Sequence, residues 1–411
     1  MKLQEYFLLP GPTDVPSNVL RTMSRPMINH RGPEFEGIMK KITEQIKRVF
    51  RTEGEVFTLT SSGTGGLEAA VVNFVNPGEK VIVASIGNFG ERFKQIAEMY
   101  DADVEFIDFG WGNCIDPAVI EKRLAEDTAH EIKAILCQHN ETSTAIVNPI
   151  KEVSEARKGH PALLIVDTVS GLGAADFRMD EWGVDVAVAG SQKAFMAPPG
   201  LAFIAANERA MKKAESGTNR KFYFDLLKAR DMLKKGQTPF TPAITTVYAV
   251  EEALEYFEEV GVDAIVADHY KRRDLVRAGL TAMGLKLVAG DDIASPAVTA
   301  VECPQGIDPT ELRNILREKY NIIIAGGQGK FAATTFRVGH LGAVRTMDLF
   351  SVIVGLELAL TELGADIELG KAVKAMEEMI LKSDFSCVWC ASQKGFKGER
   401  PSVLRAVFLP F

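Results

Sequence analysis

Lys193 stands in a sequence context that is unusual for a surface lysine. It lies in Gly190-Ser191-Gln192-Lys193-Ala194-Phe195, just beyond a β-rich run, and Ala197-Pro198-Pro199-Gly200 follows. A lysine held in an enclosed site has a lowered pKa and can attack a carbonyl group. The segment therefore suggests nucleophilic chemistry, with an ordinary solvated lysine as the alternative.

Asp167 and Ser62-Gly63-Thr64 also follow expected strands. Asp167 ends the apolar run Leu163–Asp167, where a carboxylate is unfavourable unless it has a charged or hydrogen-bonded partner. A protonated pyridine nitrogen would be such a partner, and a helix cap or a salt bridge is an equal alternative. Ser62-Gly63-Thr64 opens a helix whose free N–H groups suit a phosphate, although such a turn more often only connects a strand to a helix and binds nothing.

Arg337 lies in the strand-like run Thr335–Gly339. Its guanidinium group suits a substrate carboxylate in bidentate geometry, and an ordinary surface arginine is the alternative. A phosphate loop, a strand-end acid, a lysine and a distant arginine are each weak signals, but together they match the needs of one cofactor. Pyridoxal phosphate requires a Schiff-base lysine, a carboxylate for its ring nitrogen and phosphate donors.

The elements that must position these residues form an α/β pattern. Short apolar runs alternate with helical patterns, which predicts a mostly parallel sheet covered on both faces. The last two runs are joined only by Gly190–Gly200, so the final strand is expected to be antiparallel. The seven runs are Val56–Thr60, Val81–Ala84, Val104–Asp108, Ala134–His139, Leu163–Asp167, Asp185–Ala189 and Leu201–Ala205.

A smaller α+β unit is expected in the C-terminal part of the chain. The pattern is helical from Val247 to about Met283, and two further helical patterns follow at Met347–Leu363 and Lys371–Leu381. Between them lie four short runs that read as strands, namely Lys286–Val288, Ala297–Glu302, Ile322–Ala325 and Thr335–Val338.

Composition narrows the function classes. The 411 residues are 46% hydrophobic and 25% charged with a net charge of −8, which indicates a globular protein and argues against a nucleic-acid surface. No apolar stretch is long enough to cross a bilayer, and no signal peptide is recognised, so we expect a cytoplasmic location and no membrane partner. The five cysteines are interpreted as reduced thiols, and no metal site is expected.

With these motifs in this order, the chain resembles the class V aminotransferases of fold-type I, closest to the alanine–glyoxylate and serine–pyruvate group. The resemblance runs from Leu9-Pro10-Gly11-Pro12-Thr13 to about Leu381, and Ser191-Gln192-Lys193 is its most specific element. It implies a large pyridoxal-phosphate domain over residues 21–250 and a small domain over 251–383. Residues 1–20 would then lie over the active site, and 384–411 form an unmatched tail.

The resemblance also implies roles for individual residues. Lys193 looks like the Schiff-base lysine and Asp167 like the partner of the ring nitrogen, Arg337 resembles the substrate-carboxylate arginine, and Gly11 the segment that closes over the substrate. Phe89 matches the stacking aromatic residue, although tryptophan is common there, and Thr238 is less secure because tyrosine often fills its position. The remaining matches are Ser62, Gly63, Thr64 and Gln192 at the phosphate, Thr142 near the phenolic oxygen, Val169 on the ring, and Thr238 and Thr241 reaching the partner subunit's phosphate.

The implied reaction is ping-pong transamination between a small amino acid and a small 2-oxo acid such as glyoxylate or pyruvate, in a homodimer with a shared active site. Lys193 would also act as the general base. One alternative is a lyase or desulfurase, for which Cys303 is the candidate thiol, although Gln192 stands where desulfurases place histidine. Another is a non-catalytic subunit that retains the fold. Cys387-Val388-Trp389-Cys390 is weak support for a zinc or redox site without a second ligand pair.

Overall fold

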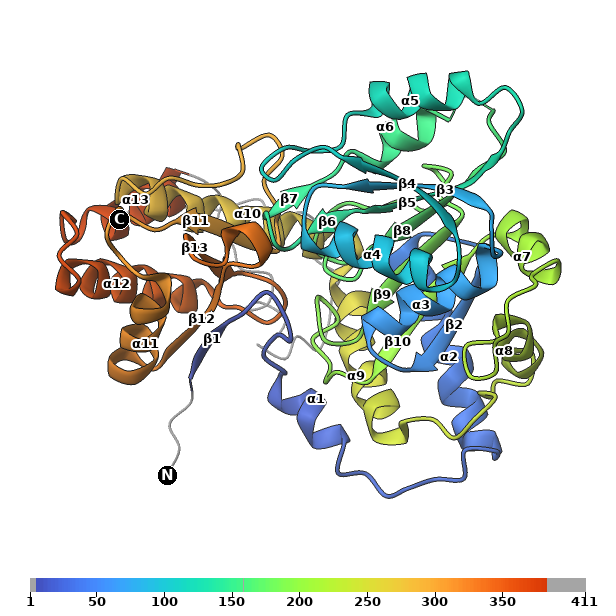
Figure 1. The fold of residues 1–411 in the computed structure, drawn as a ribbon. Helices are drawn as coiled ribbons and strands as arrows, with labels where there is room; N and C mark the ends of the chain where they lie inside the picture. The colour runs from blue at the N-terminus through green and yellow to red at the C-terminus, as the bar shows by residue number, and fades with distance from the viewer. Residues whose placement is uncertain (1–4, 158, 383–411) are drawn as a thin grey trace.

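The computed structural model describes residues 5–157 and 159–382, which form a large and a small body (Figure 1). The tail predicted for residues 384–411, with its two cysteines, lies outside the described residues. The seven-stranded sheet, mostly parallel, and the smaller C-terminal α+β part are both confirmed. The domain boundaries at residues 20, 250 and 383 stay predictions.

The large body is built on the seven-stranded sheet. Every neighbouring pair is parallel except those made by β10, which runs antiparallel to both β2 and β9, as the short connection before it predicts. In spatial order the strands are β2 (Glu55–Thr60), β10 (Leu201–Ala206), β9 (Val186–Gly190), β8 (Leu163–Asp167), β5 (Ile132–Gln138), β3 (Lys80–Ser85) and β4 (Asp103–Asp108).

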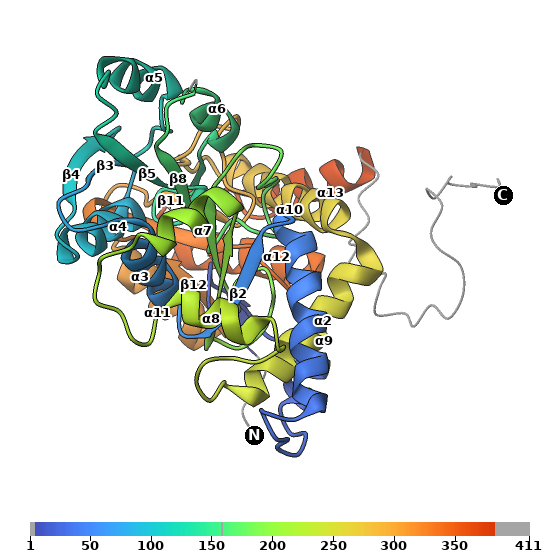
Figure 2. The same cartoon turned by 90° about the vertical axis from the view of Figure 1, so that its right-hand side faces the viewer.

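Helices cover both faces of this sheet, because successive side chains of each strand point to opposite sides. Val81 and Val83 of β3 pack into one core and Ile82 and Ala84 into the other. Figure 2 shows α2 (Pro33–Phe50) and α9 (Ile244–Val260) side by side, and both pack into the core that contains Ile82 and Ala84. One face carries α3 (Gly63–Phe74), α4 (Asn88–Met99), α7 (Glu208–Glu215) and α8 (Leu226–Leu233), and the other α2 (Pro33–Phe50), α5 (Pro117–Glu126), α6 (Ile150–Glu155) and α9 (Ile244–Val260).

The small body is a four-stranded sheet with helices packed against it. Its strands lie in the order β1 (Tyr6–Leu8), β12 (Ile322–Gly326), β13 (Thr335–Gly339) and β11 (Val298–Glu302). The helices are α10 (Val262–Ala282), α11 (Pro309–Tyr320), α12 (Thr346–Glu362) and α13 (Lys371–Lys382). No described helix is long and apolar enough to span a membrane.

Three details differ from the sequence prediction. The helical pattern from Val247 to Met283 is two helices, because Gly261 adopts a φ of 87° and breaks it between α9 and α10. The prediction of a strand at Lys286–Val288 is wrong, because Leu287 alone is paired there, in an isolated bridge with Val301. The strand β1, which the sequence did not reveal, pairs in parallel with β12.

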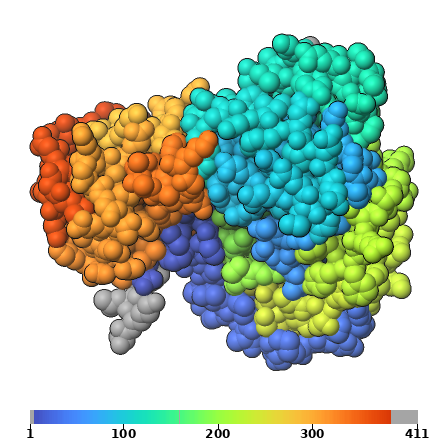
Figure 3. Space-filling model, viewed as in Figure 1, coloured from blue at the N-terminus to red at the C-terminus, as the bar shows by residue number. Residues whose placement is uncertain are grey.

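The chain crosses from the small body to the large one directly after β1. Thr13 then donates from its backbone N–H to the carbonyl of Gln192 at 3.1 Å and from Oγ1 to the carbonyl of Lys193 at 3.1 Å. The space-filling view shows this N-terminal segment, in blue, lying between the two bodies (Figure 3). The short helix α1 (Ser17–Thr22) follows and packs against α9.

Candidate active site

A cavity of about 200 Å³ lies at the carboxyl ends of the parallel strands, where open α/β sheets bind ligands. Its walls come from the N-terminal segment and from the segments that follow β2, β3, β5, β8 and β9. The cavity brings together most of the residues that the sequence singles out. They are Gly11, Ser62, Gly63, Thr64, Phe89, Thr142, Asp167, Val169, Gln192 and Lys193, joined by Leu67, Arg92, Asn140 and Ser170.

Lys193 extends into the cavity from the turn after β9. Its Nζ donates a hydrogen bond to the carbonyl oxygen of Pro10 at 2.7 Å. Burial lowers the pKa of Lys193 to about 8, helped by the positive charges of Arg337 and Arg92 and opposed by the carboxylate of Asp167. A substantial fraction of the amine is therefore unprotonated, and nucleophilic, at mildly alkaline pH.

Asp167 ends β8 and is only 5% exposed. Its Oδ1 accepts a hydrogen bond from the backbone N–H of Val169 at 2.8 Å. Burial raises the pKa of Asp167 to about 6, against the lowering effect of that hydrogen bond and of the charges on Arg92 and Lys193. At neutral pH the group is a buried carboxylate that a cationic ligand would stabilise.

The N-terminus of α3 forms another wall. Ser62 is its N-cap residue, and its side chain accepts from the N–H of Gly65 at 3.4 Å. Gly63 is needed for close packing, since a Cβ there would lie 2.8 Å from Cγ2 of Val169. The first-turn amides of a helix have no partner within the helix, so this wall presents donors to an anion.

Gln192 and Phe89 complete the surface of the cavity. Oε1 of Gln192 is buried and accepts no hydrogen bond from the described residues. The ring of Phe89 lies near the N-terminus of α4, with the guanidinium carbon of Arg92 at 4.7 Å from its centroid. Arg92 also donates to Oγ1 of Thr64 at 3.1 Å, which ties α4 to α3 across the cavity.

A cluster of polar side chains forms another part of the cavity wall. Oγ1 of Thr142 and Nδ2 of Asn140 both donate to Oγ of Ser170, at 2.8 and 2.9 Å. Ser170 in turn donates to the carbonyl of Asn140 at 3.0 Å. These bonds fix Thr142 with its hydroxyl at the cavity wall.

Arg337 lies on β13, only 5% exposed, just behind the residues that line the cavity. Its Nε donates to the carbonyl of Gly326 at 2.8 Å, and Nη1 donates to the carbonyl of Thr142 at 2.9 Å and to Oε1 of Gln328 at 3.2 Å. Among the described residues Nη2 makes no hydrogen bond. Burial lowers the pKa of Arg337 to about 10, with the nearby carboxylate of Glu141 opposing this effect.

The structure does not bring Thr238 and Thr241 to this cavity. Oγ1 of Thr238 donates to the carbonyl of Phe240 at 2.7 Å, and Arg31 donates to the carbonyl of Thr238 at 2.6 Å. Thr241 is exposed. This separation is expected for two residues that the resemblance assigns to the phosphate of a partner subunit.

Sequence reasoning missed several residues of the site. Asn140 and Ser170 belong to polar runs next to predicted residues, so their closeness to Thr142 and Val169 was the available signal. Arg92 gave no signal, because a charged residue on an amphipathic helix is usually solvent-exposed. Glu141 is fully buried and accepts a hydrogen bond from the backbone N–H of Phe89, and a polar run such as Asn140–Thr144 does not reveal burial.

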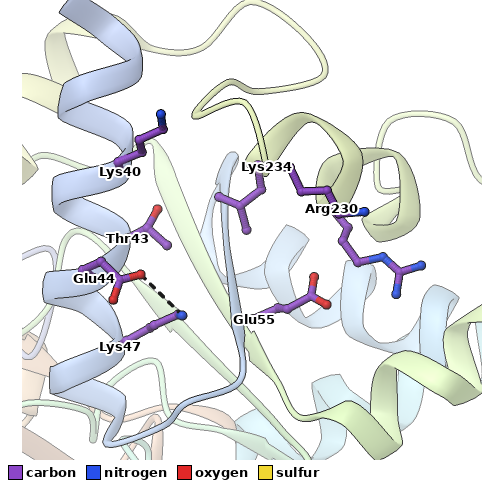
Figure 4. Close-up of a pocket in the computed structure, with 8 residues that line it drawn as sticks. Lys40, Thr43, Glu44, Lys47, Glu55, Arg230 and Lys234 are labelled. Carbon is purple, nitrogen blue, oxygen red and sulfur yellow. Dashed lines mark ion pairs between the residues drawn. The ribbon is translucent and has the colours of Figure 1, made fainter.

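A second cavity, of about 260 Å³, contains none of the predicted residues. It lies between α2, β2 and α8 (Figure 4). Its lining is charged, and Lys47 pairs with Glu44 at 3.4 Å across one turn of α2. We do not assign the candidate site to this cavity, because Lys193 and Asp167 line the other one. The lining residues are Lys40, Thr43, Glu44, Lys47, Glu55, Arg230, Leu233 and Lys234.

Comparison with known proteins decides the family. The family described as Aminotransferase class-V matches residues 5–346. The chain belongs to the class V aminotransferases. The L-aspartate–glyoxylate aminotransferase of Paracoccus denitrificans is 36% identical over 382 residues, covering 92% of this chain and 96% of that protein. A soluble hydrogenase 42 kDa subunit of Anabaena cylindrica is 38% identical over 358 residues, with 87% and 93% covered.

A solved structure shares the fold of this aminotransferase. The ureidoglycine–glyoxylate aminotransferase of Bacillus subtilis superimposes with a TM-score of 0.87 and 32% sequence identity, covering 93% of this chain and 99% of that one. The expected family and fold are therefore confirmed. The individual site residues stay predictions.

Two thiols of the aminotransferase, Cys303 and Cys137, offer little nucleophilic chemistry. Burial raises the pKa of Cys303 to about 11, and Cys137, inside the sheet, has a pKa raised to about 12. The thiolate is the reactive form of cysteine, so neither group is activated. Within residues 5–157 and 159–382 no cluster of three or more His, Cys, Asp or Glu side chains could hold a metal ion.

Proposed function

We propose that this aminotransferase uses pyridoxal phosphate to transfer an amino group from a small amino acid, such as alanine or serine, to a small 2-oxo acid, glyoxylate or pyruvate. One observation carries the proposal. The amine of Lys193 and the buried carboxylate of Asp167 line the same cavity at the carboxyl edge of the sheet. The names of two similar proteins, which include glyoxylate, support that acceptor.

The residues present fit the cofactor at its phosphate end. Gly63 and Thr64 begin α3, where first-turn amides have no acceptor within the helix, and the helix dipole favours an anion there. Gln192 would donate to a phosphate oxygen through its Nε2, and its buried Oε1 accepts no hydrogen bond from the described residues. These groups would hold the phosphate, and Ser62 would add its hydroxyl.

The same fit extends to the ring. Phe89 and Val169 are apolar side chains of the cavity and would lie on the two faces of the pyridine. Asp167 would pair with the protonated ring nitrogen, and the hydroxyl of Thr142 would lie near the phenolic oxygen. When bound, pyridoxal phosphate supplies an electron sink for the charge that develops at the substrate Cα.

Lys193 would have two tasks. It would hold the cofactor covalently through Nζ, and its amine, once displaced by the substrate, would accept the Cα proton and return it. Because burial lowers the pKa of Lys193 to about 8, the amine titrates close to physiological pH, where a general base works best.

Arg337 would bind the substrate carboxylate. Its Nε and Nη1 are held by carbonyl groups, and Nη2 remains for an external acceptor. A substrate carboxylate would reach it across the Thr142 side of the cavity. Gly11 would lie over the substrate. A Cβ at this position would lie 2.2 Å from Nζ of Lys193, so a residue with a side chain does not fit there.

The proposed enzyme is a homodimer with a shared active site. Support comes from Thr238 and Thr241, which lie away from the cavity of their own chain. Both would reach the phosphate bound by the partner subunit.

The decisive experiment is borohydride reduction of the purified, cofactor-loaded enzyme, followed by peptide mapping. We expect the reduced cofactor adduct on Lys193 and none in Lys193→Ala. A donor-by-acceptor matrix, following the aminated form of the cofactor, then defines the substrates. An adduct on another lysine, or no adduct, would overturn the assignment.

The name of the Anabaena relative raises a second candidate, a non-catalytic subunit. The retained cavity with Asp167 and Lys193 argues for catalysis instead. A colourless protein that takes up no cofactor would favour the subunit. Release of sulfide from cysteine, without amino transfer, would favour a desulfurase.

A further inference from the structure

Glu141 is a buried carboxylate whose hydrogen bonds reach two parts of the site. It is fully buried at the end of the short strand β6 (Asn140–Glu141), which pairs with β7 (Ile146–Val147). Its Oε2 accepts from the backbone N–H groups of Phe89 at 3.0 Å and Gly90 at 3.2 Å. Its Oε1 accepts from the N–H and the hydroxyl of Ser143. Both oxygens thus face donors only. Burial raises the pKa of Glu141 to about 7, and the hydrogen bonds from Ser143 and Gly90 oppose this by favouring the carboxylate.

These contacts cap helix α4 from outside its own sequence. The N-cap residue Gly87 has no side chain, and a Cβ there would lie 2.7 Å from Cδ of Glu141. Oγ of Ser143 accepts from the N–H of Asn88 at 3.0 Å, so the first three amides of α4 are all bound by the Glu141–Ser143 turn. A negative charge at a helix N-terminus is favourable, and here it fixes the backbone of Phe89.

The same turn holds Arg337. The carbonyl between Glu141 and Ser143, that of Thr142, accepts from Nη1 of Arg337 at 2.9 Å. Burial favours the neutral form of Arg337, and the nearby carboxylate of Glu141 opposes this by favouring the charged form. A buried cation and a buried anion are therefore joined through one peptide group, which lowers the cost of burying each.

We infer that Glu141 is a positioning residue that fixes the ring of Phe89 on the cofactor side and the guanidinium group of Arg337 on the substrate side. The inference rests on the proposed function for the roles of Phe89 and Arg337. Glu141 touches neither cofactor nor substrate and acts only through these two residues.

The test compares Glu141→Gln with a matched control, Glu357→Gln. Glu357 is 3% exposed and also binds a helix N-terminus, accepting from Gly370 and Ala372 at 3.0 Å each, but in the small body next to α13. Both variants place an amide NH₂ against backbone donors. The measurements are the affinity of the apoenzyme for pyridoxal phosphate, the visible circular dichroism of the bound cofactor, KM and kcat, and the melting temperature.

For Glu141→Gln we expect cofactor affinity to fall about tenfold and the KM for the amino donor to rise about tenfold, with kcat changed less. The dichroism band should also weaken, because the stacking ring has moved. Glu357→Gln should lower the melting temperature alone. If Glu141→Gln behaves like Glu357→Gln, with affinity, dichroism and KM unchanged, Glu141 is merely structural and the inference is wrong.

Two features keep the test decisive. Cofactor affinity is measured without substrate, so it tests whether Glu141 positions Phe89 even if the wild-type reaction is not the proposed transfer. If Glu141→Gln does not fold, Ser143→Ala removes one hydrogen bond to Oε1 and the acceptor for Asn88. It should then give the same pattern with a smaller effect, and wild-type affinity and KM in that variant would overturn the inference.

Discussion

Replacing Gly11 by alanine should misplace the lysine amine. The residue has a φ of 121°, and a Cβ there would lie 2.2 Å from Nζ, 2.5 Å from Cδ and 2.6 Å from Cε of Lys193. Non-bonded heavy atoms approach to about 3.5 Å, so the amine and the N-terminal segment must separate by at least about 1 Å. A displacement of about 1 Å at a reacting group can lower a rate about 100-fold, which corresponds to about 2.7 kcal/mol in the barrier.

The assay is kcat/KM for amino transfer at saturating cofactor, together with thermal unfolding. Strain at a positive φ also destabilises the fold, by about 1 to 3 kcal/mol. Gly306→Ala is the matched control, because its φ is 85° and no atom lies within 4 Å of the new Cβ. That variant should lose stability and keep its rate. A Gly11→Ala enzyme with kcat/KM within threefold of the wild type would refute the steric argument.

Four further outcomes are expected. Cofactor uptake by the apoenzyme, followed by stopped-flow absorbance, should accelerate about tenfold per pH unit up to about 8 and then level off, because only the unprotonated amine of Lys193 attacks. An inflection near 10.5 in the wild type would contradict this lowered pKa. Asp167→Asn should move the inflection to lower pH, since the carboxylate charge raises the lysine pKa, and an unchanged or higher inflection in that variant would contradict this effect. Arg337→Lys should raise the KM for the amino donor about 10- to 100-fold in initial-rate kinetics, because a lysine cannot keep the carbonyl contacts of Nε and Nη1 and also present a donor where Nη2 lies; an unchanged KM would count against its role. Cys303→Ser should leave transfer and any sulfide release unchanged, since burial raises the thiol pKa to about 11, and loss of sulfide release in this variant would favour the desulfurase alternative.

The fold could be predicted where burial leaves a repeating pattern in the sequence. The strands of the large sheet are covered on both faces, so each is a short apolar run, and the missing helix between β9 and β10 revealed the antiparallel strand. The strand β1 could not be predicted, because three residues carry no period and their partner lies more than 300 positions away. Lys286–Val288 resembled a strand but has one bridging residue.

The site could be predicted only where a residue follows a strand or matches a family motif. Lys193 and Asp167 satisfy both conditions. Arg92 and Glu141 satisfy neither, since their importance comes from side chains that meet across α3, α4 and the β6–β7 turn. Such meetings depend on three-dimensional packing between segments that are 28 and 52 residues apart.

The crossing of the chain after β1 has a consequence for how the enzyme is made. Tyr6 to Leu8 leave the ribosome early, yet their partner strand begins only at Ile322. At ordinary translation rates the wait is about 15 to 60 seconds. The carbonyl that contacts the amine of Lys193 belongs to Pro10, so the candidate site of a nascent chain stays unfinished at least until Ile322 of the 411 residues has emerged.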